Sequence, residues 1–178
     1  LAYGVDENRI HVIPNGVNPD DFPSDISSEE LTSFRNRHDL GNQPIILFMG
    51  RLNLIKGPDI LLAAFVSATK SLPRHQLVFV GPDNDMLLGL QQMVKQAGLR
   101  ERVHFLGYLG GREKACAYRA AELVVIPSRM EAMSIVVLEA GICGTPVLAT
   151  DRCGLDDLAA KGLVKLVGAD PNLMSSAL

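Results

Sequence analysis

Apolar and polar positions follow two different periods along this chain. Residues 45–49 form a continuous apolar run of strand length, which is typical of a strand covered by helices on both faces. In residues 58–72 the apolar positions Ile60, Leu61 and Phe65 recur at helical spacing, which predicts an amphipathic helix. The alternation of strand and helix continues through most of the chain. It predicts a parallel sheet with helices on both faces, a doubly wound, Rossmann-like α/β fold.

Signals at segment ends support the expected order of elements. Ser27 and Glu30 form a capping-box pattern ahead of a short helix that ends before Gly41, Pro58 suits a first helical residue, and Ser134 can cap a helix. Further helices are expected at residues 86–97, 112–121, 134–142 and 155–160. Further strands are expected at residues 9–13, 76–80, 103–106, 123–126, 147–149 and 163–167.

Composition indicates one globular domain and excludes several classes of protein. The 178 residues are 47% hydrophobic, which is enough for one good core. A formal net charge of −3 argues against a protein that binds nucleic acid, because such proteins usually carry a basic face. Apolar runs stay short of the roughly 18 residues that a membrane span needs, and no signal peptide is recognisable. We expect a single soluble, cytoplasmic domain over residues 1–178.

Cysteine and histidine positions indicate neither a disulfide framework nor a metal site. The cysteines are odd in number and lack a Cys-x-x-Cys pair, so reduced thiols are expected. The histidines are scattered without the spacing of metal ligands, so structural or exposed roles are expected. These residues are Cys116, Cys143 and Cys153, and His11, His38, His75 and His104.

Three segments with functional side chains follow strands of the expected sheet. They are residues 50–57, 106–108 and 129–134. Ligands of doubly wound sheets bind at the carboxyl ends of the strands, so the three segments should open on one edge. The sequence therefore predicts a ligand site at that edge.

Arg51 and Lys56 straddle a turn that leads into the amino end of a helix. Free amides and the helix dipole already favour an anion there, and two added cations suit a diphosphate. The alternative is that both are solvated loop charges, as most exposed lysines and arginines are.

Two carboxylates, Glu131 and Glu139, stand in the chain's most informative stretch. Glu139 lies in an almost wholly apolar run, and a buried carboxylate requires a partner that its neighbours do not supply. The two hydroxyls of a ribose would provide one, whereas the alternative is a distant arginine or backbone amide. Glu131 sits at a strand-to-helix turn, where its alternative role is to complement the helix dipole.

These motifs together resemble those of a known enzyme family. Residues 50–57 read Gly-Arg-Leu-Asn-Leu-Ile-Lys-Gly, and Glu131 and Glu139 are separated by seven residues. With the segment 11–18, they make residues 10–150 resemble the retaining glycosyltransferases of the GT-B fold, glycosyltransferase family four, also called glycosyl transferases group 1. The resemblance implies the carboxy-terminal, donor-binding half of such an enzyme, which is one half of a GT-B fold.

The resemblance also implies roles for individual residues. As catalytic groups, Arg51 and Lys56 would contact the donor's phosphates and stabilise charge on the leaving nucleotide, while Glu131 would face the transferred sugar. Glu139 would accept the ribose hydroxyls. Other donor-binding positions would be Gly50 and Gly57 for close backbone approach, Leu106, Gly107 and Tyr108 beside the base, and Met133, Ser134 and Ile135 for their amides around the diphosphate.

The chain departs from the family pattern at two places. Ala132, Met133 and Ser134 stand where the family usually has Gly, an aromatic residue and Gly, and residues 153–157 replace a Gly-Gly-x-Pro-Glu pattern. Two alternatives therefore stay open. One is a non-catalytic nucleotide-binding or scaffolding module of the same fold, and the other is a GT-B sugar-nucleotide epimerase or phosphorylase.

The resemblance implies a larger parent protein. The chain starts with Leu1, not Met, and is expected to be a fragment whose amino-terminal acceptor domain is absent. The expected partners are that domain and a nucleotide diphosphate sugar as donor, with no other cofactor and no metal. The fragment alone should be inactive. The base, the sugar, the acceptor and peripheral membrane association of the parent are left open.

Overall fold

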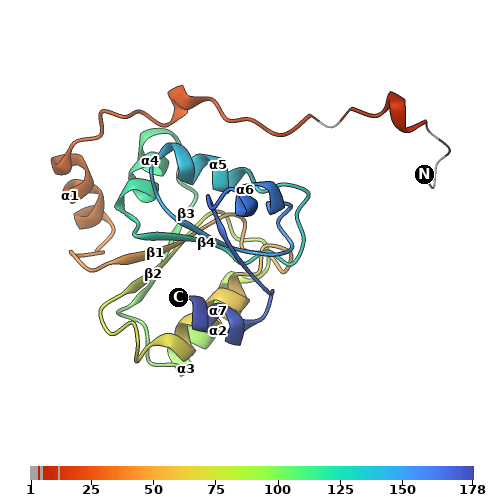
Figure 1. Ribbon diagram of the computed structural model, residues 1–178. Helices are drawn as coiled ribbons and strands as arrows, with labels where there is room; N and C mark the ends of the chain where they lie inside the picture. The colour runs from red at the N-terminus through yellow and green to blue at the C-terminus, as the bar shows by residue number, and fades with distance from the viewer. Residues whose placement is uncertain (1–3, 5, 12) are drawn as a thin grey trace.

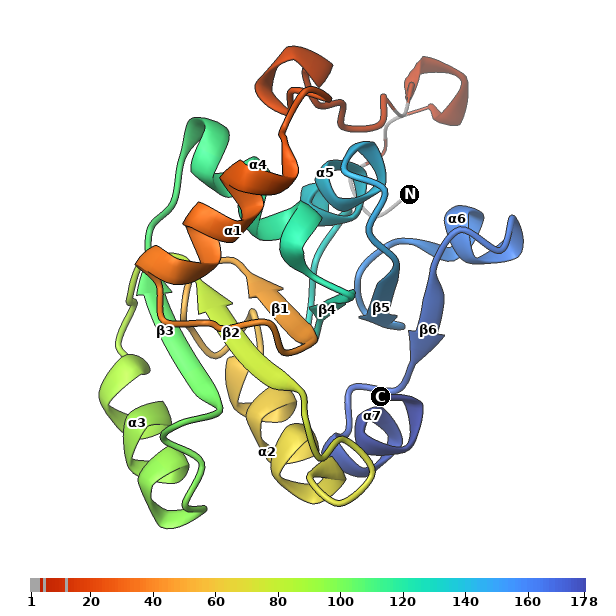
Figure 2. The same ribbon diagram turned by 90° about the vertical axis from the view of Figure 1, so that its left-hand side faces the viewer.

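A six-stranded, all-parallel sheet forms the centre of the molecule. The computed structural model describes residues 4, 6–11 and 13–178. The strand order is β3-β2-β1-β4-β5-β6, which confirms the expected doubly wound α/β fold (Figures 1 and 2). The strands are β1 Ile45–Met49, β2 Gln76–Val80, β3 Val103–Gly107, β4 Leu123–Ile126, β5 Val147–Thr150 and β6 Lys165–Val167.

Helices cover both faces of this sheet, as Figure 2 shows most clearly. On one face lie α1, α4, α5 and α6, and on the other lie α2, α3 and α7. The described α-helices are α1 Ser28–Arg37, α2 Pro58–Ala68, α3 Leu87–Gln96, α4 Gly111–Ala120, α5 Ile135–Ile142, α6 Asp156–Ala160 and α7 Pro171–Ala177.

Alternate residues of the central strands supply the two apolar layers. Leu47 and Val78 pack under the first group of helices, while Phe48 and Phe79 pack against the second. All four are nearly inaccessible to solvent. Side chains of successive strand residues point to opposite faces, so an uninterrupted apolar run is what a sheet buried on both sides requires.

Most predicted elements are confirmed to within a few residues. Strands β1, β2 and β4 have the predicted bounds, and the capping box at Ser27 and Glu30 is formed in both directions. The helix predicted over 58–72 ends at Ala68. Its last predicted residues instead form turns that lead to β2.

The strand predicted over residues 9–13 is wrong for the residues that the structure describes. Arg9 ends a short 3-10 turn, Glu7–Arg9, and the residues that follow it, apart from Val12 outside the described part, belong to no strand. In Figure 1 the described residues on either side of Val12 lie away from the sheet. Among the described residues no strand pairs with this segment, so its apolar pattern alone cannot make it a strand.

Helix α7 was not predicted. Asp170 caps it by accepting from the amides of Asn172 and Leu173, and Pro171 is its first residue. Met174 is fully buried in the same apolar layer as α2. A helix of two turns carries too few apolar positions for a clear period, so tertiary packing decides its formation.

The order of the strands places a crevice beside β1. The chain leaves β1 for β2 on one side, whereas β4 pairs with β1 on the other side. Loops that leave the carboxyl ends of these strands therefore diverge, and ligands of doubly wound sheets bind where this happens.

Candidate functional site

The loops after β1 and β2 are joined by their backbones. The Leu52 amide donates to the Pro82 carbonyl at 2.9 Å, and the Asn84 amide donates to the Leu52 carbonyl at 3.1 Å. A Cβ on Gly81, which has φ +141°, would lie 2.0 Å from the Gly50 carbonyl oxygen. Only glycine allows this approach, so the two loops form one rigid wall.

The loop after β1 is also fastened to the loop after β4. Arg129 forms a two-pronged ion pair with Asp59 at 2.8 and 2.6 Å, and its amide donates to the Ile55 carbonyl at 2.8 Å. Burial by itself would raise the pKa of Asp59, but the hydrogen bonds and charge of Arg129 outweigh it and lower that pKa. The carboxylate therefore stays ionised and ties Arg129 to the first turn of α2, while the bond to Ile55 joins the two loops.

Lys56 and Glu131 face each other across these loops. The Lys56 ammonium lies 3.0 Å from Glu131 Oε2, and the Ser128 hydroxyl donates to the other carboxylate oxygen. The Glu131 side chain is only 10% exposed. Two residues predicted to serve one ligand are thus in direct contact, and the amino-acid sequence separates them by seventy-five positions.

A cavity of about 390 Å³, here called the strand-end cavity, lies at this edge of the sheet. Six of the predicted site residues line it, namely Gly50, Arg51, Lys56, Tyr108, Ile135 and Glu139. The other lining residues are Met49, Val80, Gly81, Pro82, Leu109, Lys114 and Val136. The cavity therefore combines three cationic side chains, Arg51, Lys56 and Lys114, with one carboxylate and apolar walls.

The cavity is not lined by the remaining predicted residues, which are Gly57, Leu106, Gly107, Glu131, Met133 and Ser134. Leu106 and Met133 pack against the core, and the Gly107 carbonyl accepts from the Gly81 amide at 2.7 Å. Gly57, at φ +67°, would place a Cβ 2.1 Å from the Pro127 carbonyl oxygen. Its close approach is thus to the protein's own backbone.

Ser134 differs from its predicted role. It is the N-cap residue of α5, but its side chain makes no capping bond, and its buried hydroxyl has no partner in the structure. Its amide donates to the Cys153 carbonyl at 3.2 Å. The first turn of α5, with Ile135 and Val136 at the cavity, is the part of this helix start that remains open to a ligand.

Side chains that are distant in sequence provide the partners of the buried Glu139 carboxylate. This carboxylate is 2.5 Å from the Lys114 ammonium and accepts a 2.5 Å hydrogen bond from the Tyr118 hydroxyl. The expected partner is therefore present within the protein, and it is a lysine and a tyrosine where the sequence left open an arginine or a backbone amide. Burial, followed by the nearby Glu139, raises the pKa of Tyr118, which keeps its hydroxyl protonated as a donor.

Sequence reasoning missed Lys114 and Tyr118. They are four residues apart on α4, so both reach the same side of that helix and meet Glu139 on α5. The spacing was visible in the sequence. This spacing predicts a contact with Glu139 only when the strand order, which places α4 beside α5, is known.

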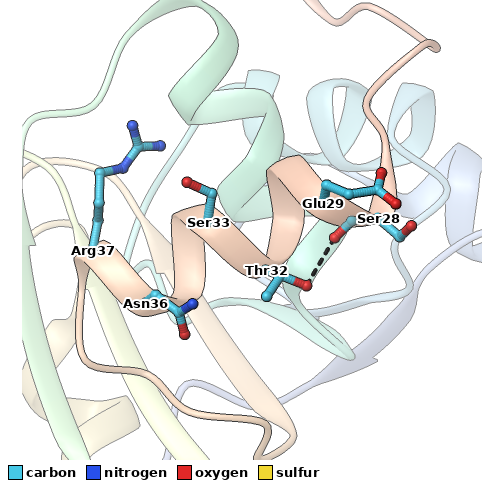
Figure 3. A pocket seen from close by; sticks show the side chains of 6 residues that line it. All are labelled: Ser28, Glu29, Thr32, Ser33, Asn36 and Arg37. Carbon is cyan, nitrogen blue, oxygen red and sulfur yellow. Dashed lines mark hydrogen bonds between the residues drawn. The ribbon is translucent and has the colours of Figure 1, made fainter.

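Another depression, about 560 Å³, runs along α1. Figure 3 shows that all six lining side chains project from this one helix. In the part of the chain that the structure describes, no second element lines this depression, and none of its lining residues lies at a strand end. The strand-end cavity is the better candidate because four segments of the chain build it.

Other features of the described residues bear on function. The cysteines Cys116, Cys143 and Cys153 are buried and free. Within residues 4, 6–11 and 13–178, no helix is long and apolar enough to cross a membrane, and no group of three or more His, Cys, Asp or Glu side chains could hold a metal ion.

Comparison with known proteins places the chain in a family. The family described as glycosyl transferases group 1 matches residues 31–177. The chain therefore belongs to the glycosyl transferases group 1. It is 39% identical over 160 residues to a D-inositol 3-phosphate glycosyltransferase of Xylanimonas cellulosilytica, covering 86% of this chain and 37% of that protein. It is 38% identical over 159 residues to an uncharacterized glycosyltransferase of Methanocaldococcus jannaschii, covering 88% and 40%.

Solved structures share the fold of this chain. The Anabaena protein Alr3699/HepE, in complex with UDP-glucose, matches with a TM-score of 0.85 and 25% identity over 99% of this chain and 48% of that one. The C-terminal domain of a group 1 glycosyl transferase of Francisella tularensis, LpcC, shares the fold with a TM-score of 0.75 and 24% identity, covering 91% and 85%. The chain spans about two fifths of the length of the curated relatives named above.

Proposed function

We propose that the strand-end cavity binds the nucleoside diphosphate part of a sugar donor. The observation that carries this proposal is that Arg51, Lys56 and Glu139 line one cavity at the carboxyl edge of the sheet. Two cations suit a diphosphate, and a carboxylate suits the hydroxyls of a ribose. The relative from Anabaena, solved with UDP-glucose, supports the same class of ligand.

Arg51 and Lys56 have different surroundings, so the two side chains would contact the diphosphate in different ways. Arg51 is exposed and makes no ion pair with any residue that the structure describes, so it is ready to meet a phosphate. Lys56 is held by Glu131 at 3.0 Å. A diphosphate would share the Lys56 ammonium with Glu131, and the start of α5 would add its amides and dipole.

In this proposal the chain is the donor-binding domain of a larger retaining glycosyltransferase. When the bond between the sugar and the donor breaks, negative charge develops on the departing diphosphate. Fixed cations at Arg51 and Lys56 would stabilise that charge, which is often the largest electrostatic contribution to such a reaction. Glu131, which contacts Lys56 directly, would orient the transferred sugar.

An amino-terminal acceptor domain of the same parent chain is the proposed partner. Leu54, Ile55 and Met130, in the loops after β1 and β4, are 62%, 51% and 69% exposed. Large apolar side chains gathered at a binding edge favour a covering partner. The acceptor and the sugar transferred would then depend on that domain, and the fragment alone would bind a donor without turning it over.

Isothermal titration calorimetry of the chain with UDP, GDP and ADP tests the proposal. We expect one of the three to bind with a 1:1 ratio, and Arg51→Ala to weaken that binding by about tenfold, as for the loss of one charged hydrogen-bond partner. Arg100→Ala is the matched control, because Arg100 is exposed just ahead of β3, away from the cavity. No binding by any of the three nucleotides would contradict the proposal and would favour a scaffolding module.

The epimerase or phosphorylase alternative is tested on the parent enzyme. An epimerase alters its sugar nucleotide without an acceptor, and a phosphorylase uses inorganic phosphate. We expect product analysis to detect sugar transfer that depends on an added acceptor. A sugar nucleotide consumed or inverted in the absence of any acceptor would contradict the transferase proposal.

A further inference from the structure

The buried carboxylate of Glu139 is held from two sides by one helix. Lys114 Nζ lies 2.5 Å from Oε1, and the Tyr118 hydroxyl lies 2.5 Å from Oε2. Each carboxylate oxygen can accept two hydrogen bonds, so each keeps one acceptor position after these contacts. Glu139 lines the strand-end cavity, so a ligand there can reach the positions that remain.

Lys114 is itself held in place. Its side chain is 27% exposed, and its ammonium lies 5.3 Å from the centre of the Phe22 ring, within the range of a cation–π contact. The Phe22 ring also packs edge-on against Tyr118, with centroids 6.1 Å apart. Phe22 is 5% exposed and comes from the segment before α1, so three parts of the chain fix the orientation of the two donors.

Lys114 and Glu139 occupy the wall between two cavities. A second cavity, of about 330 Å³, lies next to the strand-end cavity, and Tyr108, Lys114, Ile135 and Glu139 line both. A carboxylate in such a wall could turn toward either side. The contacts with Lys114 and Tyr118 prevent this turning, and the ion pair with Lys114 also offsets the cost of keeping a charged carboxylate away from water.

We propose that Lys114 and Tyr118 are positioning residues that aim the free acceptor positions of Glu139 at a vicinal diol, and that they thereby select ribonucleotides over deoxyribonucleotides. This inference rests on the proposed function, because it assigns the two residues a part in the same nucleotide site. Neither residue is expected to touch the phosphates. Their effect should therefore fall on the choice of sugar within the nucleotide, not on diphosphate affinity in general.

The test compares the dissociation constants of a ribonucleoside diphosphate and its 2′-deoxy counterpart, measured by calorimetry with whichever of UDP, GDP and ADP binds. We expect the wild type to prefer the ribonucleotide by about tenfold, as one hydrogen bond to a charged group would give. In Lys114→Met and in Tyr118→Phe the ratio should fall toward one. Lys114→Arg, which keeps a cationic donor, should restore most of the preference. Lys95→Met, an exposed change on α3, should leave the ratio unaltered.

The outcomes separate this inference from the proposed function. If the wild type binds a nucleotide and Lys114→Met and Tyr118→Phe keep the full ribose preference while only their melting temperatures fall, the two residues are merely structural and the inference is wrong. If the wild type binds no nucleotide, the proposed function itself fails. Should Lys114→Met not fold, Tyr118→Phe decides, because it removes one hydroxyl and keeps the packing of the ring.

Discussion

The Lys56 ammonium lies 3.0 Å from a carboxylate oxygen of Glu131, which joins the loop after β1 to the loop after β4. Both side chains are largely buried, at 25% and 10% exposure. The pair therefore belongs to the protein before any ligand arrives. Under the proposed function, a diphosphate would meet at Lys56 a cation that is already fixed in position.

A double-mutant cycle measures how much the contact between Lys56 and Glu131 stabilises the folded chain. We expect Lys56→Met and Glu131→Gln to be coupled by about 1 kcal/mol in the free energy of unfolding, since the pair is partly shielded from solvent and its partners are in direct contact. Urea unfolding of the wild type, the two single variants and the double variant provides the four values. Strictly additive effects would mean that the observed contact contributes nothing to stability.

Gly57→Ala should destabilise the chain strongly. Its backbone has φ +67°, and an added Cβ would lie 2.1 Å from the Pro127 carbonyl oxygen, so strain and a steric clash combine. We expect a loss of about 2–4 kcal/mol in unfolding free energy. Gly41→Ala is the matched control, since Gly41 has φ +53° with no atom near its Cβ position, and only the backbone strain of about 1 kcal/mol applies. Equal losses of unfolding free energy in the two variants would show that the clash of the added Cβ with Pro127 has no effect.

The attachment of α1 to α4 should depend on pH in the acid range. The hydrogen bonds from Arg112, followed by that from the Ser27 amide, lower the pKa of Glu30 from 4.5 to about 2. A lowered carboxylate pKa adds stability that is complete above the unfolded-state value and is lost as pH falls through the folded-state value. The stabilising effect should therefore disappear between about pH 4.5 and pH 2.

Thermal unfolding of the wild type and Arg112→Gln across this range checks that expectation. The wild type should melt at a higher temperature at pH 6, and the difference should shrink as pH falls. Lys95→Gln, an exposed change on α3, controls for the loss of one positive charge. A difference that stays constant down to pH 2 would contradict the role of Glu30.

The sequence predicted the sheet well because buried parallel strands are nearly continuous apolar runs. Ile45–Met49 has the predicted bounds. Helices cover both of its faces, so burial favours an apolar side chain at successive positions. The predicted strand over 9–13 failed for a different reason, since among the described residues no strand lies beside it. Strands require neighbours for their backbone hydrogen bonds, and a local pattern does not reveal whether a neighbour exists.

The position of the candidate site could be predicted from the sequence, because the order of strands and helices determines which loops meet. Carboxyl-end loops of neighbouring strands must meet, and Arg51 and Lys56 do line one cavity with Glu139. Side-chain partners were not predictable in this way. Lys114 and Tyr118 reach Glu139 only because α4 and α5 lie side by side on the sheet, an arrangement that depends on strand order and not on local sequence.

The central claim is that one nucleotide binds among the loops after β1, β2, β3 and β4. Titration of the ¹⁵N-labelled chain with UDP, GDP and ADP, followed by amide chemical shifts, tests it most directly. We expect the largest changes in residues 50–57, 81–84, 107–110 and 134–139, with α3 and the depression along α1 unaffected. Changes confined to α1, or no change with any of the three nucleotides, would contradict the account.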